Sequence, residues 1–483
     1  MKEGPREAKS WLGAVIILLF VVLHLPYINA DPVDHHSWRQ VTTLGVARSF
    51  YYESADFFHP RVFERGDKSG ITGMECPIYN FMIFIFMTIF GYANWYGRVL
   101  SLVFGAFGLY WLWRLAALEN GRGPALMSLL FLAVSPLYFF FSRNTQPDIP
   151  MTSLLIGSFY FIETWGKSGR SGHFWTASIL ITAAALIKLP AIIFLPLFAF
   201  TIYFKSRERL VACWRAYLFI AIPVLLAGGW YLYSRYLVAK YELQYFYLGA
   251  DILKSIAFFP SIKFLRTVII SRLPEIVANY AAFPFFVAGL ALYKKIGYSR
   301  NTAILLLLMI PYYIAGGFNL YVHNYYSLPA APLVALVAGP AAWYLIRNSR
   351  KAVKTLAVVL VVLAPVVGVL RTTVWYRPLY SEFRAARGMV ERHVPDKALM
   401  VAAWRVDPTL LFFTYRNGWA IPPEAADASD LYARGARFLM TTAKADSAIA
   451  QHSLLEQVER NDSLILYAIT RGEKPGDSEP ESR

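Results

Sequence analysis

The chain has 483 residues, of which 57% are hydrophobic and only 16% are charged, and apolar runs recur along most of its length. This composition excludes a soluble globular protein and is typical of polytopic membrane proteins. The net charge of +16 would indicate a nucleic-acid partner in a soluble protein. Here the basic residues lie in short clusters between apolar runs, where they set membrane orientation, so we expect no nucleic-acid partner.

The first apolar run, 11–28, follows three basic residues. The positive-inside rule therefore places the N-terminus in the cytoplasm and Asp31 outside. A cleaved signal peptide is the alternative, but Asn29 interrupts the small-x-small pattern that cleavage requires.

The run 78–93 is the ambiguous element, because its most apolar part is shorter than the ~20 residues that a span needs. If it crossed the membrane, every later basic loop would be inverted against the positive-inside rule. We therefore expect a juxtamembrane or re-entrant helix on the outer side. The expected spans are 11–28, 96–118, 124–141, 149–165, 174–187, 189–204, 216–233, 276–293, 302–315, 326–346 and 355–370.

The predicted architecture is an all-α polytopic membrane domain followed by a small soluble α/β domain. The membrane domain covers 1–371 and carries a first outer loop, 29–95, and a middle outer loop, 234–275. In the region 372–472, possible helices (378–393 and 430–435) alternate with β-rich runs (398–403, 437–442 and 463–470). The last residues, 473–483, are rich in Pro, Gly, Ser and acids and predict a disordered tail.

Two carboxylates of the first outer loop are candidates for acid–base chemistry. Asp34 follows the first span closely and precedes His35, His36 and Trp38, and an apolar surface beside such a carboxylate suits a general base. Helix capping is the alternative for Asp34. Glu75 precedes the juxtamembrane helix, where the helix dipole alone could account for an acid.

Charged residues also lie where spans emerge outside. Arg143 and Asp148 flank a turn between two spans, so we expect them to pair with each other or to face a polar cavity. Lys188 interrupts an apolar hairpin, where it suits a lipid phosphate or simply snorkels to the interface.

The segment 316–329 is a polar, aromatic and uncharged turn between two later spans. His323 could donate to a phosphate, and Tyr325 and Tyr326 could stack on a sugar, although tyrosines are also common at membrane interfaces. Adjacent His35 and His36 point in different directions and have no third ligand at suitable spacing, so we expect no resident metal site.

Together these features resemble the GT-C fold membrane glycosyltransferases, specifically the superfamily of aminoarabinose transferases and protein O-mannosyltransferases. The resemblance covers nearly the whole chain and rests on the order of weak motifs. Its sharpest part is the run from Asp34 to Gln40, which resembles the Asp-x-His-Ser-Trp-Arg-Gln sequence of some members. It implies about 11 to 13 transmembrane helices, with juxtamembrane helices in the first outer loop.

The resemblance implies an inverting transferase that moves a sugar from a polyprenyl-phosphate donor to an acceptor on the outer face of the bacterial cytoplasmic membrane. The acceptor would be a glycolipid such as lipid A, a glycan or a protein. A monomer is expected, with a periplasmic C-terminal domain and membrane lipids around it, and a divalent cation is the one candidate cofactor. Asp34, Glu75 and Asp148 would be the catalytic acids.

The resemblance also implies groups around the donor. Cations or donors near the phosphate would be Lys188, His323, Arg39, Arg143 and Arg272, and pocket residues would be His36, Trp38, Tyr325 and Tyr326. Aminoarabinose transferases carry Glu-Lys-Pro-Pro where this chain has Glu75, Cys76 and a single Pro77. Arg39, Arg61 or a residue of the middle loop such as Arg272 would then replace the missing lysine.

Two other classes of protein compete with this reading. A transporter of lipid-linked sugars would carry charges at the membrane midplane and broken helices inside its spans. An O-antigen ligase or polymerase would carry several arginines in its outer loops. The ionisable residues of this chain instead cluster at the outer ends of its predicted spans, which favours the transferase.

Overall fold

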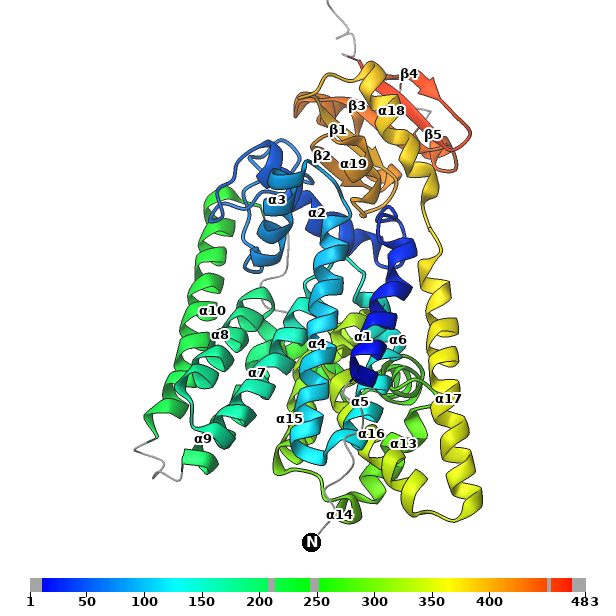
Figure 1. The fold of residues 1–483 in the computed structure, drawn as a ribbon. Coiled ribbons are helices and arrows are strands. Elements are labelled where there is room, and N and C mark those ends of the chain that lie inside the picture. Colours follow the sequence, from blue (N-terminus) through cyan, green and yellow to red (C-terminus); the bar gives the residue numbers. More distant parts are fainter. Residues whose placement is uncertain (1–10, 207–212, 244–251, 450–452, 471–483) are drawn as a thin grey trace, which may run out of the picture.

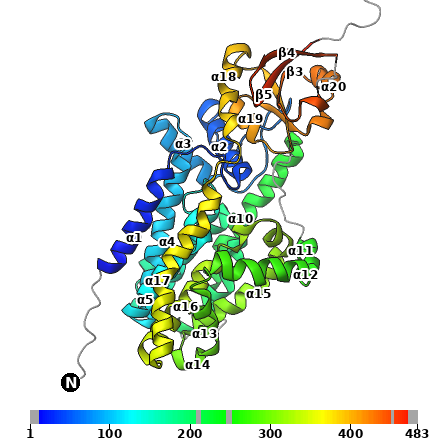
Figure 2. The ribbon, with the colours of Figure 1, turned by 90° about the vertical axis from the view of Figure 1, so that its right-hand side faces the viewer.

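The computed structural model describes residues 11–206, 213–243, 252–449 and 453–470. Figure 1 shows an elongated helical bundle with a small sheet at one end, and Figure 2 shows that α1, with which the described chain begins, lies at the edge of the bundle. The tail predicted at 473–483 lies outside the described residues.

Five helices of the described chain are long and apolar enough to cross a membrane. They are α4 (Tyr96–Asn120), α10 (Trp214–Tyr241), α15 (Arg300–Val322), α16 (Ala330–Asn348) and α17 (Lys351–Thr373). Other apolar helices complete the bundle: α1 (Trp11–His24), α5 (Arg122–Ala133), α6 (Pro136–Phe141), α7 (Asp148–Ser168), α8 (Ser171–Ile187), α9 (Leu195–Ser206) and α13 (Phe283–Ala291). A mostly helical membrane fold is thus confirmed, while the number of spans stays a prediction.

Several predicted spans are interrupted, and a proline marks the irregularity in two of them. The span expected at 124–141 breaks between α5 and α6, where Ser135 caps the second helix and Pro136 occupies its first position. The Ser135 hydroxyl donates to the carbonyl of Val277 at 2.8 Å, which ties the break to a neighbouring segment. The span expected at 189–204 starts as a 3₁₀ helix, η2 (Leu189–Phe194), with Pro190 in its first turn.

The ambiguous run forms a short helix, α3 (Ile78–Phe90), which packs against α2 (Ser37–Tyr52). Its residues Tyr79, Ile83 and Met87 repeat every four positions and share a hydrophobic core with the C-terminal domain. Figure 1 shows α2 and α3 beside the sheet at the same end of the bundle. This placement is the one expected of a juxtamembrane helix.

The middle loop predicted at 234–275 is largely helical in the part that the structure describes. Helix α10 continues to Tyr241, and α11 (Ile252–Phe258) and α12 (Ile262–Phe264) project to the side of the bundle in Figure 2. A π-helix, η4 (Leu265–Val277), follows directly. Such helices are rare and often accompany functional sites. Two short elements, α14 (Tyr293–Ile296) and the 3₁₀ helix η5 (Asn324–Ser327), precede and follow α15.

The C-terminal domain is a five-stranded mixed sheet in the order β2-β1-β3-β5-β4. The strands are β1 (Leu399–Ala403), β2 (Gly418–Ile421), β3 (Ala436–Thr442), β4 (Leu455–Arg460) and β5 (Leu464–Ile469). The helices are α18 (Arg384–His393), α19 (Thr409–Thr414) and α20 (Ala428–Ala433). Strands β1 and β3 are parallel, whereas β5 pairs antiparallel with β3 and β4. The sequence patterns did not predict β2, β4 or α19.

The first outer loop and this domain form one unit. The Arg48 guanidinium of α2 lies over the rings of Phe63 and Phe412 and donates to the Phe412 carbonyl at 2.8 Å. The amides of Arg65 and Gly66 donate to the carbonyl of Gly418 at the start of β2. Because helix, loop and sheet share these contacts, the domain holds the loop that carries Asp34 and Glu75.

Candidate active site

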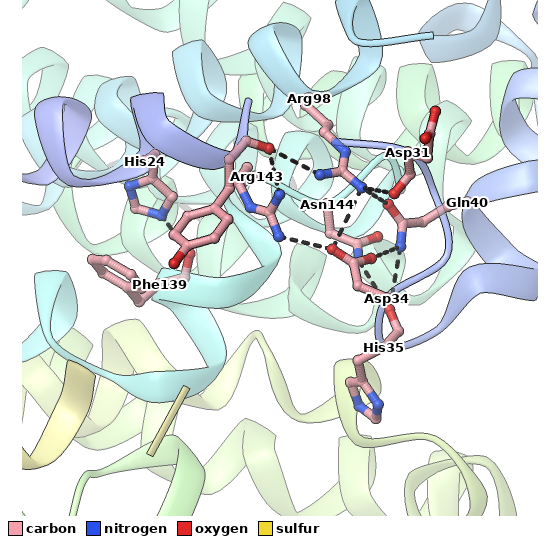
Figure 3. Close-up of polar contacts among 10 residues, drawn as sticks. His24, Asp31, Asp34, His35, Gln40, Arg98, Phe139, Arg143 and Asn144 are labelled. Carbon is pink, nitrogen blue, oxygen red and sulfur yellow. Dashed lines mark hydrogen bonds and ion pairs between the residues drawn. The ribbon is translucent and has the colours of Figure 1, made fainter. Parts of the chain in front are cut away.

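Asp34 lies at the centre of a buried ion network, shown in Figure 3. Its Oδ2 accepts hydrogen bonds from Arg143 at 2.8 Å and from Arg98 at 3.4 Å, and its Oδ1 accepts one from the Gln40 carboxamide at 2.5 Å. Both arginines also donate to the carbonyl of Tyr27, at 2.6 and 3.0 Å. Asp34 is 4% exposed and each arginine 1%. Both carboxylate oxygens are therefore occupied by donors from the protein.

The network corrects the expected pairing of Arg143 with Asp148. Arg143 follows the end of α6 and reaches back toward the end of α1, whereas Asp148 opens α7 and faces Lys188. The turn between the two helices separates their side chains. Arg143 is also held by Asp34 and stacks over the Tyr376 ring at 4.4 Å, which disfavours its expected contact with a donor phosphate.

Two further ion pairs form a second cluster at the same end of the bundle. Asp148 pairs with Lys188, and both side chains are almost fully buried. Glu75 pairs with Arg39 and keeps 20% of its side chain exposed. The charges of Arg39 and Glu75 act on Asp148, so the two pairs belong to one electrostatic unit. The structure thus brings together two of the predicted acids and two of the predicted cations.

Aromatic rings close this cluster on the side of η5. The Lys188 ammonium lies 4.7 Å from the ring centre of Tyr325 and 4.4 Å from that of Tyr326. A cation over a ring face is stabilised by the ring quadrupole. His323 stacks on Tyr325 with the ring centres 5.1 Å apart. The predicted pocket tyrosines therefore contact the predicted phosphate-binding lysine.

Close backbone packing positions Glu75. A Cβ on Gly73 would lie 1.9 Å from the Ser234 carbonyl of α10, so only glycine permits this approach. Trp230 and Ser234 both donate to the carbonyl of Met74, at 2.9 and 2.8 Å. Glu75 is thereby presented to a small cavity whose lining is Arg39, Thr42, Thr43, Met74, Glu75, Cys76, Tyr79, Asn80, Pro147 and Ile187.

The two histidines of the first loop share one partner. His36 Nε2 lies 2.8 Å from Asn324 Oδ1, and His35 Nε2 lies 3.2 Å from Asn324 Nδ2. Burial lowers the pKa of His36 to about 4 and that of His35 to about 3, so both rings are neutral at pH 7. His36 also has a φ of 60°, a left-handed conformation that costs free energy in a non-glycine residue and is often found at functional sites.

Other predicted residues occupy different surroundings. Arg272 of η4 donates to the carbonyls of Leu320 and Tyr321 at the end of α15, and its charge reaches His36. Trp38 is 51% exposed and does not line the cavity next to Glu75. Within 11–206, 213–243, 252–449 and 453–470, no three His, Cys, Asp or Glu side chains gather as a metal site would require.

Sequence reasoning singled out neither Gln40 nor Asn324 as a functional residue. Both are polar residues that the fold buries, and each bridges a group of the first loop to another segment. Their signal in the sequence is weak, because an amide at the start of a helix or in an aromatic turn is common on a protein surface.

Comparisons with known proteins identify the fold of the chain. Residues 74–232 match the family model described as dolichyl-phosphate-mannose-protein mannosyltransferase. ArnT from Cupriavidus metallidurans bound to undecaprenyl phosphate superposes with a TM-score of 0.69 and 12% identity, covering 95% of this chain and 98% of that one. No curated protein sequence matches this chain.

Two more distant structures share the fold. The archaeal oligosaccharyltransferase AglB from Archaeoglobus fulgidus, in complex with an inhibitory peptide and a dolichol-phosphate, gives a TM-score of 0.58 at 11% identity, covering 97% of this chain and 75% of that one. The mycobacterial arabinofuranosyltransferase AftD gives 0.57 at 13% identity, covering 96% and 42%. The resemblance predicted from the order of motifs is confirmed: the chain has the GT-C fold of these membrane glycosyltransferases.

Proposed function

We propose that this protein transfers a sugar from a polyprenyl-phosphate donor to an acceptor on the outer face of the bacterial cytoplasmic membrane. The observation that carries the proposal is the second cluster, in which the Glu75–Arg39 and Asp148–Lys188 pairs meet beneath the first outer loop. Acids suited to proton transfer and cations suited to a phosphate are the two components that such a transfer needs. The undecaprenyl phosphate in the ArnT structure, which has a similar fold, supports a lipid-linked donor.

In the proposed step, an acceptor hydroxyl attacks the anomeric carbon of the sugar. Glu75 or Asp148 takes the proton of that hydroxyl, and the new bond forms between the acceptor oxygen and the anomeric carbon. The bond from the anomeric carbon to the phosphate oxygen breaks, and the polyprenyl phosphate leaves with the electron pair. Because the displacement is direct, the anomeric configuration is inverted.

Lys188 and Arg39 would stabilise the charge that develops on the leaving phosphate. Lys188 suits this role because Tyr325 and Tyr326 fix its ammonium and because it lies beside a candidate base. The neutral His323 and the charged Arg272, both near η5, would complete the binding site for the phosphate of the sugar donor. The neutral His323 ring can donate a hydrogen bond to the phosphate.

Asp34 takes a different role in this proposal than its sequence context suggested. Its two oxygens already accept three hydrogen bonds from protein donors, so it is poorly placed to receive a proton from a substrate. We assign it as a positioning residue that fixes the α6–α7 turn through Arg143. That turn positions Asp148 at the start of α7.

Transfer by the purified, full-length protein in lipid nanodiscs tests the proposal. Undecaprenyl-phosphate arabinose, mannose and glucose, each radiolabelled in the sugar, would be supplied with lipid A or a glycan extract as acceptor. We expect consumption of one donor and a loss of at least about 100-fold in Asp148→Asn. Asp462→Asn, at an exposed turn of the C-terminal domain, is the matched control and should keep full activity.

Two results would overturn the proposal. Label that crosses the membrane with its lipid carrier intact would instead identify a transporter. Full activity of Asp148→Asn would remove this cluster as the site of transfer.

A further inference from the structure

The turn between α6 and α7 concentrates buried polar atoms that have no hydrogen-bond partner among the described residues. They are Nε of Arg143, Oδ1 of Asn144, Oγ1 of Thr145, both Oε1 and Nε2 of Gln146, and Oδ2 of Asp148. Each such atom destabilises the fold when nothing replaces the water that it loses on burial. Six of them within six consecutive residues indicate that something polar binds this turn when the protein works.

Gln146 is the most informative member of the group. Its side chain is 1% exposed, and both ends of its carboxamide are without a partner in the described part of the chain. An amide offers a donor and an acceptor side by side. Two adjacent hydroxyls of a sugar ring present the complementary acceptor and donor. A phosphate satisfies only the amide N–H, and a lipid chain satisfies neither end of the carboxamide.

The turn is held rigidly in place. A Cβ on Gly97 of α4 would lie 2.3 Å from Thr145 Cγ2, so glycine permits the close approach of helix and turn. Ser101 of the same helix donates to the Asn144 carbonyl at 2.7 Å. A rigid support of this kind keeps the unpartnered atoms from turning toward other protein groups.

The turn also adjoins the groups that the proposed function assigns to transfer. Pro147 lines the same cavity as Glu75 and Arg39. Asp148 uses Oδ1 for Lys188 and leaves Oδ2 buried without a partner. A sugar whose phosphate is bound by Lys188 would therefore have its ring within reach of the residues around Pro147.

We propose that Gln146 reads the transferred sugar by binding two vicinal hydroxyls through its carboxamide. This inference rests on the proposed function and names the substrate class more narrowly: a sugar with at least one adjacent pair of hydroxyls near the reacting end. Gln146 sets which sugar is accepted and takes no part in proton transfer.

The test compares donors that differ by one hydroxyl. Whichever undecaprenyl-phosphate sugar the wild type consumes is tested beside its 2-deoxy and 3-deoxy analogues, for wild type, Gln146→Leu and Gln146→Glu. Wild type should prefer the natural donor in kcat/KM, and Gln146→Leu should reduce that preference by roughly 10-fold, since a site built for hydroxyls rejects analogues that lack them. Gln457→Leu, an exposed position of β4, is the matched control.

Stability separates this role from a structural one. Because Gln146→Leu removes two unsatisfied buried atoms at similar volume, its Tm without substrate should equal or exceed that of wild type. A variant that loses Tm, or one that keeps the wild-type preference among the three donors, overturns the inference while leaving the proposed function in place. If Gln146→Leu does not fold, that too counts against it, and Gln146→Glu still reports on preference. Failure of wild type to consume any donor would overturn the proposed function and this inference together.

Discussion

Two groups of charges lie at one end of the bundle and differ in how completely they are satisfied. Around Asp34, both carboxylate oxygens accept protein donors, and both partner arginines hold backbone carbonyls as well. Around Asp148, one carboxylate oxygen is buried without a partner in the described structure, and so is the carboxamide of the nearby Gln146. Arg143 Nε also has no partner among the described residues, so the contrast lies in the two carboxylates. A carboxylate whose oxygens both accept protein donors stabilises the fold, whereas one with a buried oxygen left without a donor can accept a hydrogen bond from a ligand.

The comparison explains why burial and charge alone do not identify a catalytic acid. Asp34 and Asp148 are both nearly inaccessible, at 4% and 1% exposure, and both have a basic partner. The two acids differ in the number of hydrogen bonds that their carboxylate oxygens accept from protein donors. The predictions below address that difference.

The largest effect is expected for Asp34→Ala. The substitution leaves the buried guanidinium groups of Arg98 and Arg143 without their carboxylate, and loss of one partner from a buried pair typically costs about 3–5 kcal/mol. Thermal unfolding of the protein in detergent measures this cost as a lower Tm.

Asp31→Ala is the control for that measurement. Asp31 pairs with Arg384 at 2.5 Å, but both side chains are well exposed, so the loss should stay below about 1 kcal/mol. If Asp34→Ala unfolded like wild type and lost only transfer activity, Asp34 would be a catalytic residue and the contrast between the two groups would fail.

A smaller effect, confined to activity, is expected for Glu75→Gln. The Arg39–Glu75 pair is partly exposed, so its loss should change the unfolding free energy by about 1 kcal/mol at most. If Glu75 shares proton transfer with Asp148, kcat should fall by about 100-fold. The rate of sugar transfer in nanodiscs measures this, with Glu456→Gln of β4 as the exposed control. Unchanged kcat would leave Asp148 as the sole candidate base.

The smallest effect concerns Glu64, a half-buried carboxyl that forms no ion pair with a basic side chain among the described residues. Glu64 belongs to none of the ion pairs found among the described residues, and burial, with the charge of Asp407 second, raises its pKa from 4.5 to about 8. Its backbone bridges to Gly418, so it lies where the first outer loop meets the C-terminal domain.

The sign of the pH effect follows from that shift. The folded protein holds the proton that the unfolded chain releases near pH 4.5, so the contribution of Glu64 to stability is fully present below that pH and is lost as pH rises toward 8. A shift of this size corresponds to at most about 3.5 kcal/mol between pH 5 and pH 8, and solvent around the partly exposed carboxyl reduces it, so Glu64→Gln should gain roughly 1–2 kcal/mol on wild type over that range. The test measures Tm across this pH range for wild type, Glu64→Gln and the exposed control Glu424→Gln. Parallel curves for wild type and Glu64→Gln would contradict the assignment of a raised pKa to Glu64.

Sequence patterns predicted much of the fold but less of the site. The short apolar length of 78–93 and the basic loops that follow it predicted a helix on the outer side of the membrane, and the structure has the helix α3 there in the chain. β1, β3 and β5 were predictable because they are apolar runs with buried residues. β4 was not, because its sequence, Leu455–Arg460, is half charged and forms the edge of the sheet.

The sequence by itself determined that the chain is a membrane protein and the order of its motifs, and it predicted the acids and cations that a transfer reaction would need. These properties depend on composition and on local period, which the chain carries residue by residue. Only the tertiary structure decided which acid meets which cation. Arg143 pairs with Asp34, 109 positions away, and not with Asp148, five positions on, because a tight turn and two rigid helices direct neighbouring side chains to opposite sides.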